Sequence, residues 1–176
     1  MDTNEPMLTG LFRDRESAER AYQSVSDRGY GRDDVDVVMS DETRKRHFSK
    51  PYADVRDSVS GTTAAEGAGI GGAIGGSIGA IAAAIAAVGT TVALPGLGLV
   101  IAGPLAAALA GAGAGAATGG IIGALIGWGI PEERVRVYDE GIREGGILMA
   151  VRPRNPEDAS HLEDAWKANR GEHVYR

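Results

Sequence analysis

The pattern of hydrophobic and polar positions divides the chain into two outer regions with short repeats and a central region that is almost entirely apolar. Near the start, residues 7–12 (MLTGLF) form a short apolar run, which predicts a strand. A helix is predicted next, since Asp14 is a favourable N-cap and Gly29 a favourable C-terminal stop. The apolar residues of this helix share one face: Ala18, Ala21, Tyr22 and Val25. Alternation of apolar and polar residues over 35–39 predicts a second strand.

The C-terminal region repeats this plan. Residues 147–151 (ILMAV) predict a strand, and Asn155 followed by Pro156 is typical of the first residues of a helix. The apolar stripe of this helix consists of Ala159, Leu162, Ala165 and Trp166. Gly171 is placed to end the helix, and residues 172–175 (EHVY) predict a last short strand.

Two strand–helix–strand units of this size predict an α+β fold, a split ferredoxin-like sandwich in which an antiparallel sheet carries helices on one face. We expect residues 7–39 to form the first βαβ half, and residues 131–176 to form an additional helix and the second half. The second and third strands of this topology are antiparallel neighbours, so an insertion between them starts and ends at the same place. Residues 40–66 are predicted to be a linker, and residues 67–130 an inserted α-helical hairpin rich in Gly and Ala.

The central region, residues 67–130, contains no Asp, Glu, Lys, Arg or His over 64 positions and holds 19 of the 27 glycines. Many of these glycines recur every four residues, which places them on one helix face where another backbone can approach closely. The predicted helix-packing and oligomerisation residues are Gly67, Gly71, Gly75, Gly79, Gly103, Gly111, Gly115, Gly119, Gly123 and Gly127. Because each glycine costs about 1 kcal/mol against Ala in a helix, the rows indicate that tight helix packing offsets this cost.

The two arms of the hairpin, residues 67–88 and 104–129, have the lengths of bilayer-spanning helices, about 33 and 39 Å against a hydrocarbon core of about 30 Å. The connection between them is itself apolar, and its predicted turn residues are Leu94, Pro95, Gly96, Gly98 and Pro104. An apolar turn disfavours free exposure to water. Three arrangements remain open: insertion into a membrane, an apolar core shared by many copies, and the buried core of a monomer.

The flanks of the central region carry the membrane-interface candidates Arg44, Lys45, Arg46, Lys50, Trp128, Arg134 and Arg136. The inter-arm turn has no basic residue, so the positive-inside rule predicts that both termini lie on the cytoplasmic side of the inner membrane. The first residues, MDTNEPMLTGLF, do not have the pattern of a secretory signal, which agrees with this expectation. A cytoplasmic assembly of many copies is the alternative location.

Net charge and amino-acid composition argue against several classes of function. A net charge of −6 argues against general nucleic-acid binding, and the chain has no cysteine for thiol chemistry or zinc–thiolate sites. The string from Gly67 to Gly72 matches G-x-G-x-x-G but has no preceding buried strand and no acidic residue about 20 positions after it. The three histidines are scattered along the sequence. We therefore expect no catalytic residues, no cofactor, no metal and no small-molecule substrate, and the chain is predicted not to be an enzyme.

Residues 10–40, 94–133 and 138–151 together resemble the bacterial general stress proteins, in which an apolar Gly/Ala-rich hairpin interrupts a small α/β domain. The most specific part of the resemblance is the run from Leu94 to Glu133 followed by Gly145-Gly146. The resemblance implies a non-enzymatic, stress-related role and supplies no catalytic residues. The sequence thus predicts a stress-associated protein whose glycine-zipper hairpin enters a membrane and drives homo-oligomeric assembly, and which protects or remodels that membrane. The alternatives are a soluble self-assembling scaffold with an apolar, lipid-holding interior and, ranked lower, a pore.

Overall fold

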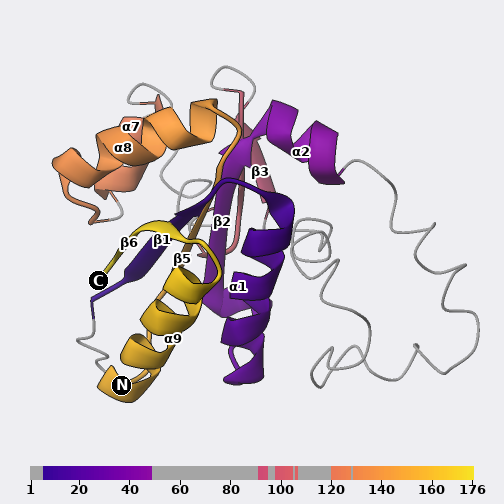
Figure 1. Ribbon diagram of the computed structural model, residues 1–176. Coiled ribbons are helices and arrows are strands. Elements are labelled where there is room, and N and C mark those ends of the chain that lie inside the picture. Colours follow the sequence, from indigo (N-terminus) through magenta and orange to yellow (C-terminus); the bar gives the residue numbers. More distant parts are fainter. Residues whose placement is uncertain (1–5, 49–90, 95–97, 105, 107–119, 128) are drawn as a thin grey trace, which may run out of the picture.

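The computed structural model of the chain describes residues 6–48, 91–94, 98–104, 106, 120–127 and 129–176. Within these residues the fold is α+β and is built on one antiparallel sheet with the strand order β3-β4-β2-β5-β1-β6 (Figure 1). The strands are β1 (Leu8–Phe12), β2 (Val35–Ser40), β3 (Thr91–Leu94), β4 (Leu99–Ala102), β5 (Ile147–Val151) and β6 (Glu172–Tyr175). The helices are α1 (Arg15–Asp27), α2 (Asp41–Phe48), α7 (Gly120–Gly127), α8 (Glu132–Arg143) and α9 (Pro156–Ala168), with a short 3-10 helix η1 (Arg32–Asp34) before β2.

The four strands predicted from the outer regions, β1, β2, β5 and β6, are all present. Strand β5 lies between β1 and β2, where Ile147 is opposite Phe12 of β1 and Met39 of β2. All five residues of β5 are buried. The apolar run ILMAV is therefore the central strand of the described sheet, and burial on both faces explains why it does not alternate with polar residues.

The helices begin where their capping residues predict. The Asp14 carboxylate accepts a hydrogen bond from the Ser17 N–H at 2.8 Å and so caps the start of α1. Asn155 accepts a hydrogen bond from the Asp158 N–H at 2.8 Å in the same way, directly before Pro156, the first residue of α9. The additional helix predicted from Pro131 is α8, for which Pro131 is the N-cap.

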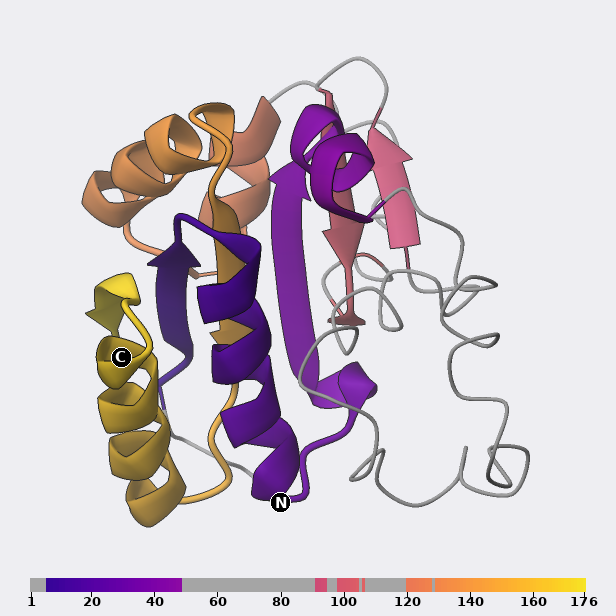
Figure 2. The same ribbon diagram turned by 45° about the vertical axis from the view of Figure 1, so that its right-hand side comes forward.

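Helices α1 and α9 cover one face of the sheet (Figures 1 and 2). Trp166 of α9 is fully buried there, packs edge-on against Phe12 with ring centroids 5.7 Å apart, and donates a hydrogen bond to the Ala21 carbonyl at 3.2 Å. A Cβ at Gly10 of β1 would lie 2.9 Å from the Trp166 ring, so this strand position must be glycine for the indole to reach the sheet. These contacts bind α1, α9 and β1 into one core.

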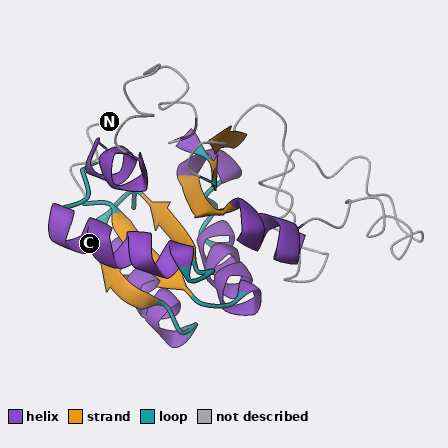
Figure 3. Ribbon diagram, turned by 90° about the horizontal axis from the view of Figure 1, so that it is seen from above, coloured by secondary structure: helices purple, strands orange, loops and turns teal. Residues whose placement is uncertain are grey.

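Helices α7 and α8 pack on the opposite face, so the sheet lies between two helical layers (Figure 3). Their core contains Leu11 and Leu148 from the sheet, Leu125 from α7 and Tyr138 from α8. The Tyr138 hydroxyl is 2.8 Å from the Thr9 hydroxyl and donates to the His173 carbonyl at 2.7 Å. Helix α8 is thereby held by hydrogen bonds as well as by apolar packing.

The prediction of a turn between two helices at residues 94–104 is wrong in the described residues. Strand β3 ends at Leu94 and pairs with β4 as a β-hairpin, in which Leu94 is opposite Leu99. Strand β4 then pairs with β2, from Leu99 opposite Ser40 to Ala102 opposite Val37. The β-branched residues in this segment favour strands, and the hairpin supplies hydrogen-bond partners to the edge of β2. Of the predicted turn, Pro95 and Gly96 lie outside the described residues.

Gly103 and Pro104 also differ from the prediction. Gly103 follows β4 with φ +106°, and a Cβ there would lie 2.3 Å from the Val35 carbonyl oxygen. It is therefore a glycine required by close backbone approach to β2 and not a member of a helical row. Pro104 is exposed and helical, whereas Gly98, with φ +64°, does belong to a turn, the one that precedes β4.

Two further differences concern the regions beside the hairpin. Helix α2 occupies residues 41–48 of the predicted linker 40–66. Helix α7 confirms helical structure for residues 120–127 of the second arm, 104–129. The first arm, residues 67–88, and residues 107–119 of the second arm lie outside the described residues.

Candidate self-association surface

Helix α7 is fixed to the domain by one side and by its C-terminal end. Leu125 is 1% exposed and lies in the core between the sheet and α8. After the helix, the Gly129 N–H donates to the Ile126 carbonyl at 2.9 Å and the Ile130 N–H donates to the Leu125 carbonyl at 3.1 Å. Gly129 has φ +91°, so these bonds form a Schellman cap, in which buried Ile130 packs in the same core as Leu125.

The other side of α7 is apolar and is not covered by any of the described residues. Ile122 and Ile126 are 37% and 44% exposed and are four residues apart, so they form a ridge on one helix face. A Cβ placed at Gly123 or Gly127 would meet no described atom within 4 Å, so a groove runs beside the ridge. We call these four residues the α7 face. A ridge of isoleucines beside a groove of glycines has the shape that close helix pairing requires.

The α7 face contains two of the ten glycines predicted for helix packing. Gly123 and Gly127 lie there, whereas Gly103 lies beside β2. The remaining seven lie outside the described residues: Gly67, Gly71, Gly75, Gly79, Gly111, Gly115 and Gly119. The spacing of the glycines predicted the groove. It did not predict the ridge, because the burial of Leu125 decides which isoleucines stay exposed.

The basic residues of α2 are paired with acidic neighbours. Arg44 and Lys45 contact the Asp41 carboxylate at 2.8 and 2.6 Å, and Arg46 contacts Glu42 at 2.6 Å. Hydrogen bonds from Lys45 and Arg44 lower the pKa of Asp41 below its usual value. These three predicted membrane-interface residues therefore have much of their positive charge balanced within the helix that carries them.

The basic residues of α8 also have local partners. The Arg134 guanidinium stacks over the Tyr175 ring at 4.4 Å and donates to the Arg176 carbonyl at 3.0 Å. Arg136 contacts Glu132 at 3.0 Å. The other two interface candidates, Lys50 and Trp128, lie outside the described residues.

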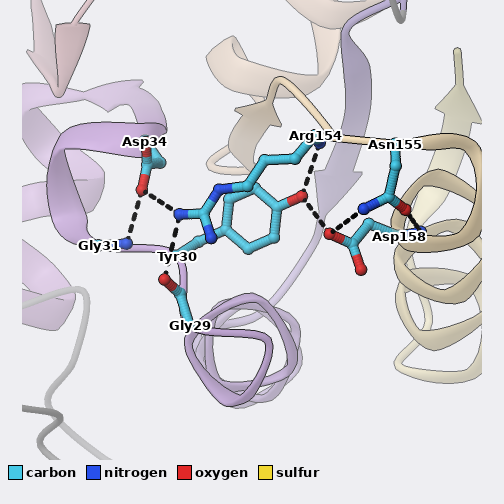
Figure 4. A network of polar contacts seen from close by, with 7 residues as sticks. All are labelled: Gly29, Tyr30, Gly31, Asp34, Arg154, Asn155 and Asp158. Atoms are coloured by element: carbon cyan, nitrogen blue, oxygen red, sulfur yellow. Dashed lines mark hydrogen bonds and ion pairs between the residues drawn. The ribbon is translucent and has the colours of Figure 1, made fainter. Parts of the chain in front are cut away.

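A polar network around the buried residues Tyr30 and Asp158 joins the two βαβ halves (Figure 4). The Tyr30 hydroxyl donates to Asp158 Oδ2 at 2.8 Å and accepts from the Arg154 N–H at 2.8 Å. The Arg154 guanidinium lies 4.1 Å from the centre of the Tyr30 ring and donates to the Gly29 carbonyl and to Asp34. Burial first, and then the neighbouring Asp158, raise the pKa of Tyr30. Sequence reasoning did not find this network, because the bonds between its two groups of residues join positions 120 to 128 apart.

Two features relevant to function are absent from the residues that the structure describes. No helix there combines the length and the apolar character needed to cross a membrane. In the same ranges, no three His, Asp or Glu side chains gather where they could hold a metal ion.

No protein-family model, curated protein or solved structure matches this chain. The interpretation of its function therefore depends on the arrangement of its own residues.

Proposed function

We propose that this protein is a non-enzymatic assembly protein whose α7 face pairs with the α7 face of other copies. The observation that carries the proposal is an isoleucine ridge and a glycine groove side by side on the exposed side of a helix whose opposite side is locked in the core. The ridge of one copy fits the groove of another, as in small-residue helix pairs. A stress-related role, as in the general stress proteins, is part of the proposal and comes from the resemblance alone.

The domain that presents the α7 face is proposed to be a split ferredoxin-like sandwich. The order β6-β1-β5-β2 within the sheet, and the packing of α1 and α9 on one face, support this assignment. The β3–β4 hairpin and the helices α7 and α8 are additions to that core. The hairpin lengthens the sheet, and α7 and α8 cover its second face.

The strength of one α7 contact is limited. Full burial of an isoleucine contributes about 1.5–3 kcal/mol, so covering Ile122 and Ile126 in both copies contributes roughly 2–5 kcal/mol from their present exposures of 37% and 44%. Association costs about 4–15 kcal/mol in lost translational and rotational freedom. A single pair of α7 faces is therefore marginal, and stable assembly needs more than one contact per copy.

Assembly is better supported than membrane insertion. Residues 49–90 begin after α2 and end at Thr91 of β3, and both elements belong to the same domain. A helix over 67–88 would be about 33 Å long and would end three residues, at most about 10 Å, from the sheet. If that helix crossed a bilayer, residues 49–66 would have to cross back, and they include Asp54, Arg56 and Asp57. Charged side chains at the bilayer centre are costly.

The test uses the full chain with Gly123→Leu and Gly127→Leu together. Both positions are open, so the leucines fit the isolated domain and replace residues of poor helix propensity. They fill the groove, and we expect sedimentation velocity to show loss of the assembly at an unchanged circular dichroism spectrum. Gly123→Ala with Gly127→Ala is the matched control, which improves helix propensity but leaves room for a ridge, and it should still assemble.

Two results would contradict the proposal. The wild-type protein could be monomeric across the accessible concentration range, or the leucine variant could assemble as well as the alanine control. Flotation of the wild-type protein with vesicles of anionic phospholipid tests the membrane alternative. Flotation that the leucine variant keeps or increases, in a protein that is monomeric without vesicles, would favour lipid as the partner of the α7 face, because leucine favours an apolar phase more than glycine does.

A further inference from the structure

The described sheet ends in two edges of different character. Strand β6 forms one edge, beside β1, and strand β3 forms the other, beside β4. An edge strand has N–H and C=O groups on its outer side that can pair with a strand of another chain. Proteins usually block such edges with charges, bulges or irregular backbone.

The β6 edge is blocked in several of these ways. Its pairing with β1 shifts register between Thr9 and Leu11, and His173 within it has φ +50°. Glu172 at its start contacts Arg13 at 2.8 Å, which places an ion pair beside the strand. Charge and backbone irregularity together make this edge unsuitable for regular pairing with another strand.

The β3 edge has none of these features. The strand Thr91–Leu94 contains no charged residue, proline or glycine, and its pairing with β4 is regular over all four residues. Strand β4 is in turn regularly paired with β2. Among the described residues, no strand pairs with the outer side of β3.

We propose that β3 pairs with β3 of a second copy in antiparallel orientation, so that one sheet continues through both copies. The inference rests on the proposed function in one respect, that the partner is another copy of this chain. When a strand pairs with the same strand of a second copy, like charges come close together and repel. Strand β3 has no charged residue, so pairing of two β3 strands is free of this repulsion.

The position of the Gly/Ala-rich segments also favours a second copy as the partner. One of these segments ends at Thr91, where β3 begins, and the other begins at Gly103, directly after β4. Antiparallel pairing of two such short strands keeps Thr91 of one copy within about 10 Å of Thr91 of the other, so the uncharged segments of both copies start on the same side of the assembly. It also supplies the second contact per copy that the α7 face requires.

Hydrogen exchange of the native full chain, measured at a low and a high protein concentration, tests the inference without any mutation. An unpaired edge leaves alternate amides of β3 open to water. Pairing protects them, and we expect their exchange to be at least about tenfold slower at the high concentration. The amides of β6 are the internal control, and their exchange is expected to be independent of concentration.

A single-cysteine scan then locates the contact. The chain has no cysteine, so Val92→Cys or Ala93→Cys introduces the only thiol. A two-fold axis normal to an antiparallel sheet places one residue opposite its own copy, at a Cα separation of about 4.5–5.5 Å, which lies within the range of disulfides. We expect oxidation to link two chains at one of these two positions and not at Tyr175→Cys on β6, where the native side chain is 39% exposed.

The outcomes separate this inference from the proposed function. If the wild-type protein assembles but β3 exchange is independent of concentration and neither cysteine links two chains, β3 pairing is wrong and the α7 proposal stands. If Gly123→Leu with Gly127→Leu leaves the assembly intact while β3 is protected at high concentration, the α7 proposal is wrong and β3 pairing stands. Both are supported if that variant forms only a dimer with a protected β3.

Discussion

Replacing Tyr30 with Phe removes one hydroxyl group from the junction of the two βαβ halves. The hydroxyl donates to Asp158 and accepts from the Arg154 N–H, each at 2.8 Å, in a side chain that is only 4% exposed (Figure 4). The ring remains, so its stacking against the Arg154 guanidinium at 4.1 Å is preserved. The substitution therefore isolates the contribution of the two hydrogen bonds that the buried hydroxyl makes, one buried and one part-buried.

The expected loss follows from what the hydroxyl leaves behind. A hydrogen bond to a charged group contributes about 1.5–3 kcal/mol, and a buried donor without a partner costs about 1–3 kcal/mol. Asp158 keeps its contacts with Arg28 at 3.1 Å and Asn155 at 3.3 Å, which reduces the loss on the carboxylate side. We expect the free energy of unfolding to fall by about 2–3 kcal/mol.

Urea unfolding followed by far-UV circular dichroism measures this change. Tyr22→Phe is the matched control, since Tyr22 is 5% exposed and its hydroxyl has no hydrogen-bond partner among the described residues. We expect the control to change stability by less than about 0.5 kcal/mol. Equal losses in the two variants would refute the reasoning, because burial of a tyrosine and not the Tyr30 network would then explain the effect.

Two further substitutions test other features of the fold. Burial raises the pKa of Asp14, but hydrogen bonds from the N–H and hydroxyl of Ser17 outweigh it and hold the pKa below its ordinary value of 3.8. The depressed pKa means that this stabilisation is complete above 3.8 and is lost as the pH falls below it, so the advantage of wild type over Asp14→Asn should shrink between about pH 6 and pH 2 in urea titrations. Gly103→Ala and Gly98→Ala both place alanine at a positive φ, which costs about 1–2 kcal/mol, but only the former puts a Cβ 2.3 Å from the Val35 carbonyl. Thermal unfolding should therefore show a clearly larger loss for Gly103→Ala, and equal losses would contradict the close approach of Gly103 to β2.

The outer regions of the fold were predictable because their signals are local. Asp14 and Asn155 each accept the N-cap hydrogen bond that their sequence context indicates. The stop after α9 was predicted one residue too late, since the left-handed residue is Arg170, with φ +62°, and Gly171 follows it with its N–H donating to the Trp166 carbonyl at 2.8 Å. Such signals depend on neighbouring residues only, so they survive without knowledge of the tertiary structure.

The β3–β4 hairpin was not predicted, because the uncharged Gly- and Ala-rich segments on both sides were interpreted as helices and the residues between them as their turn. The local signal was present, since Val92 on one side of Pro95-Gly96, and Val100 with Ile101 on the other, are typical of a hairpin. The sequence pattern did not show that the edge of β2 is the hydrogen-bonding partner of β4. Strands that pair across about 60 residues of sequence produce no periodic pattern from which the pairing could be predicted.

Only the glycines of the candidate surface could be predicted from the sequence. The spacing of Gly123 and Gly127 predicted a small-residue groove, and helix α7 places both on an open face. The exposure of Ile122 and Ile126 depends on the burial of Leu125 against the sheet and α8, which is a tertiary contact. The ion pairs of Arg44, Lys45, Arg46 and Arg136 join residues three or four positions apart in one helix, so they follow from the sequence once the helices are assigned.

The most direct test of the central claim is sedimentation velocity of the native full chain beside Gly123→Leu with Gly127→Leu, at matched concentrations and without detergent. Pairing through the α7 face predicts a multi-copy species for the wild type and a species no larger than a dimer for the variant. A wild-type protein that stays monomeric, or a variant that sediments with the wild type, would contradict it.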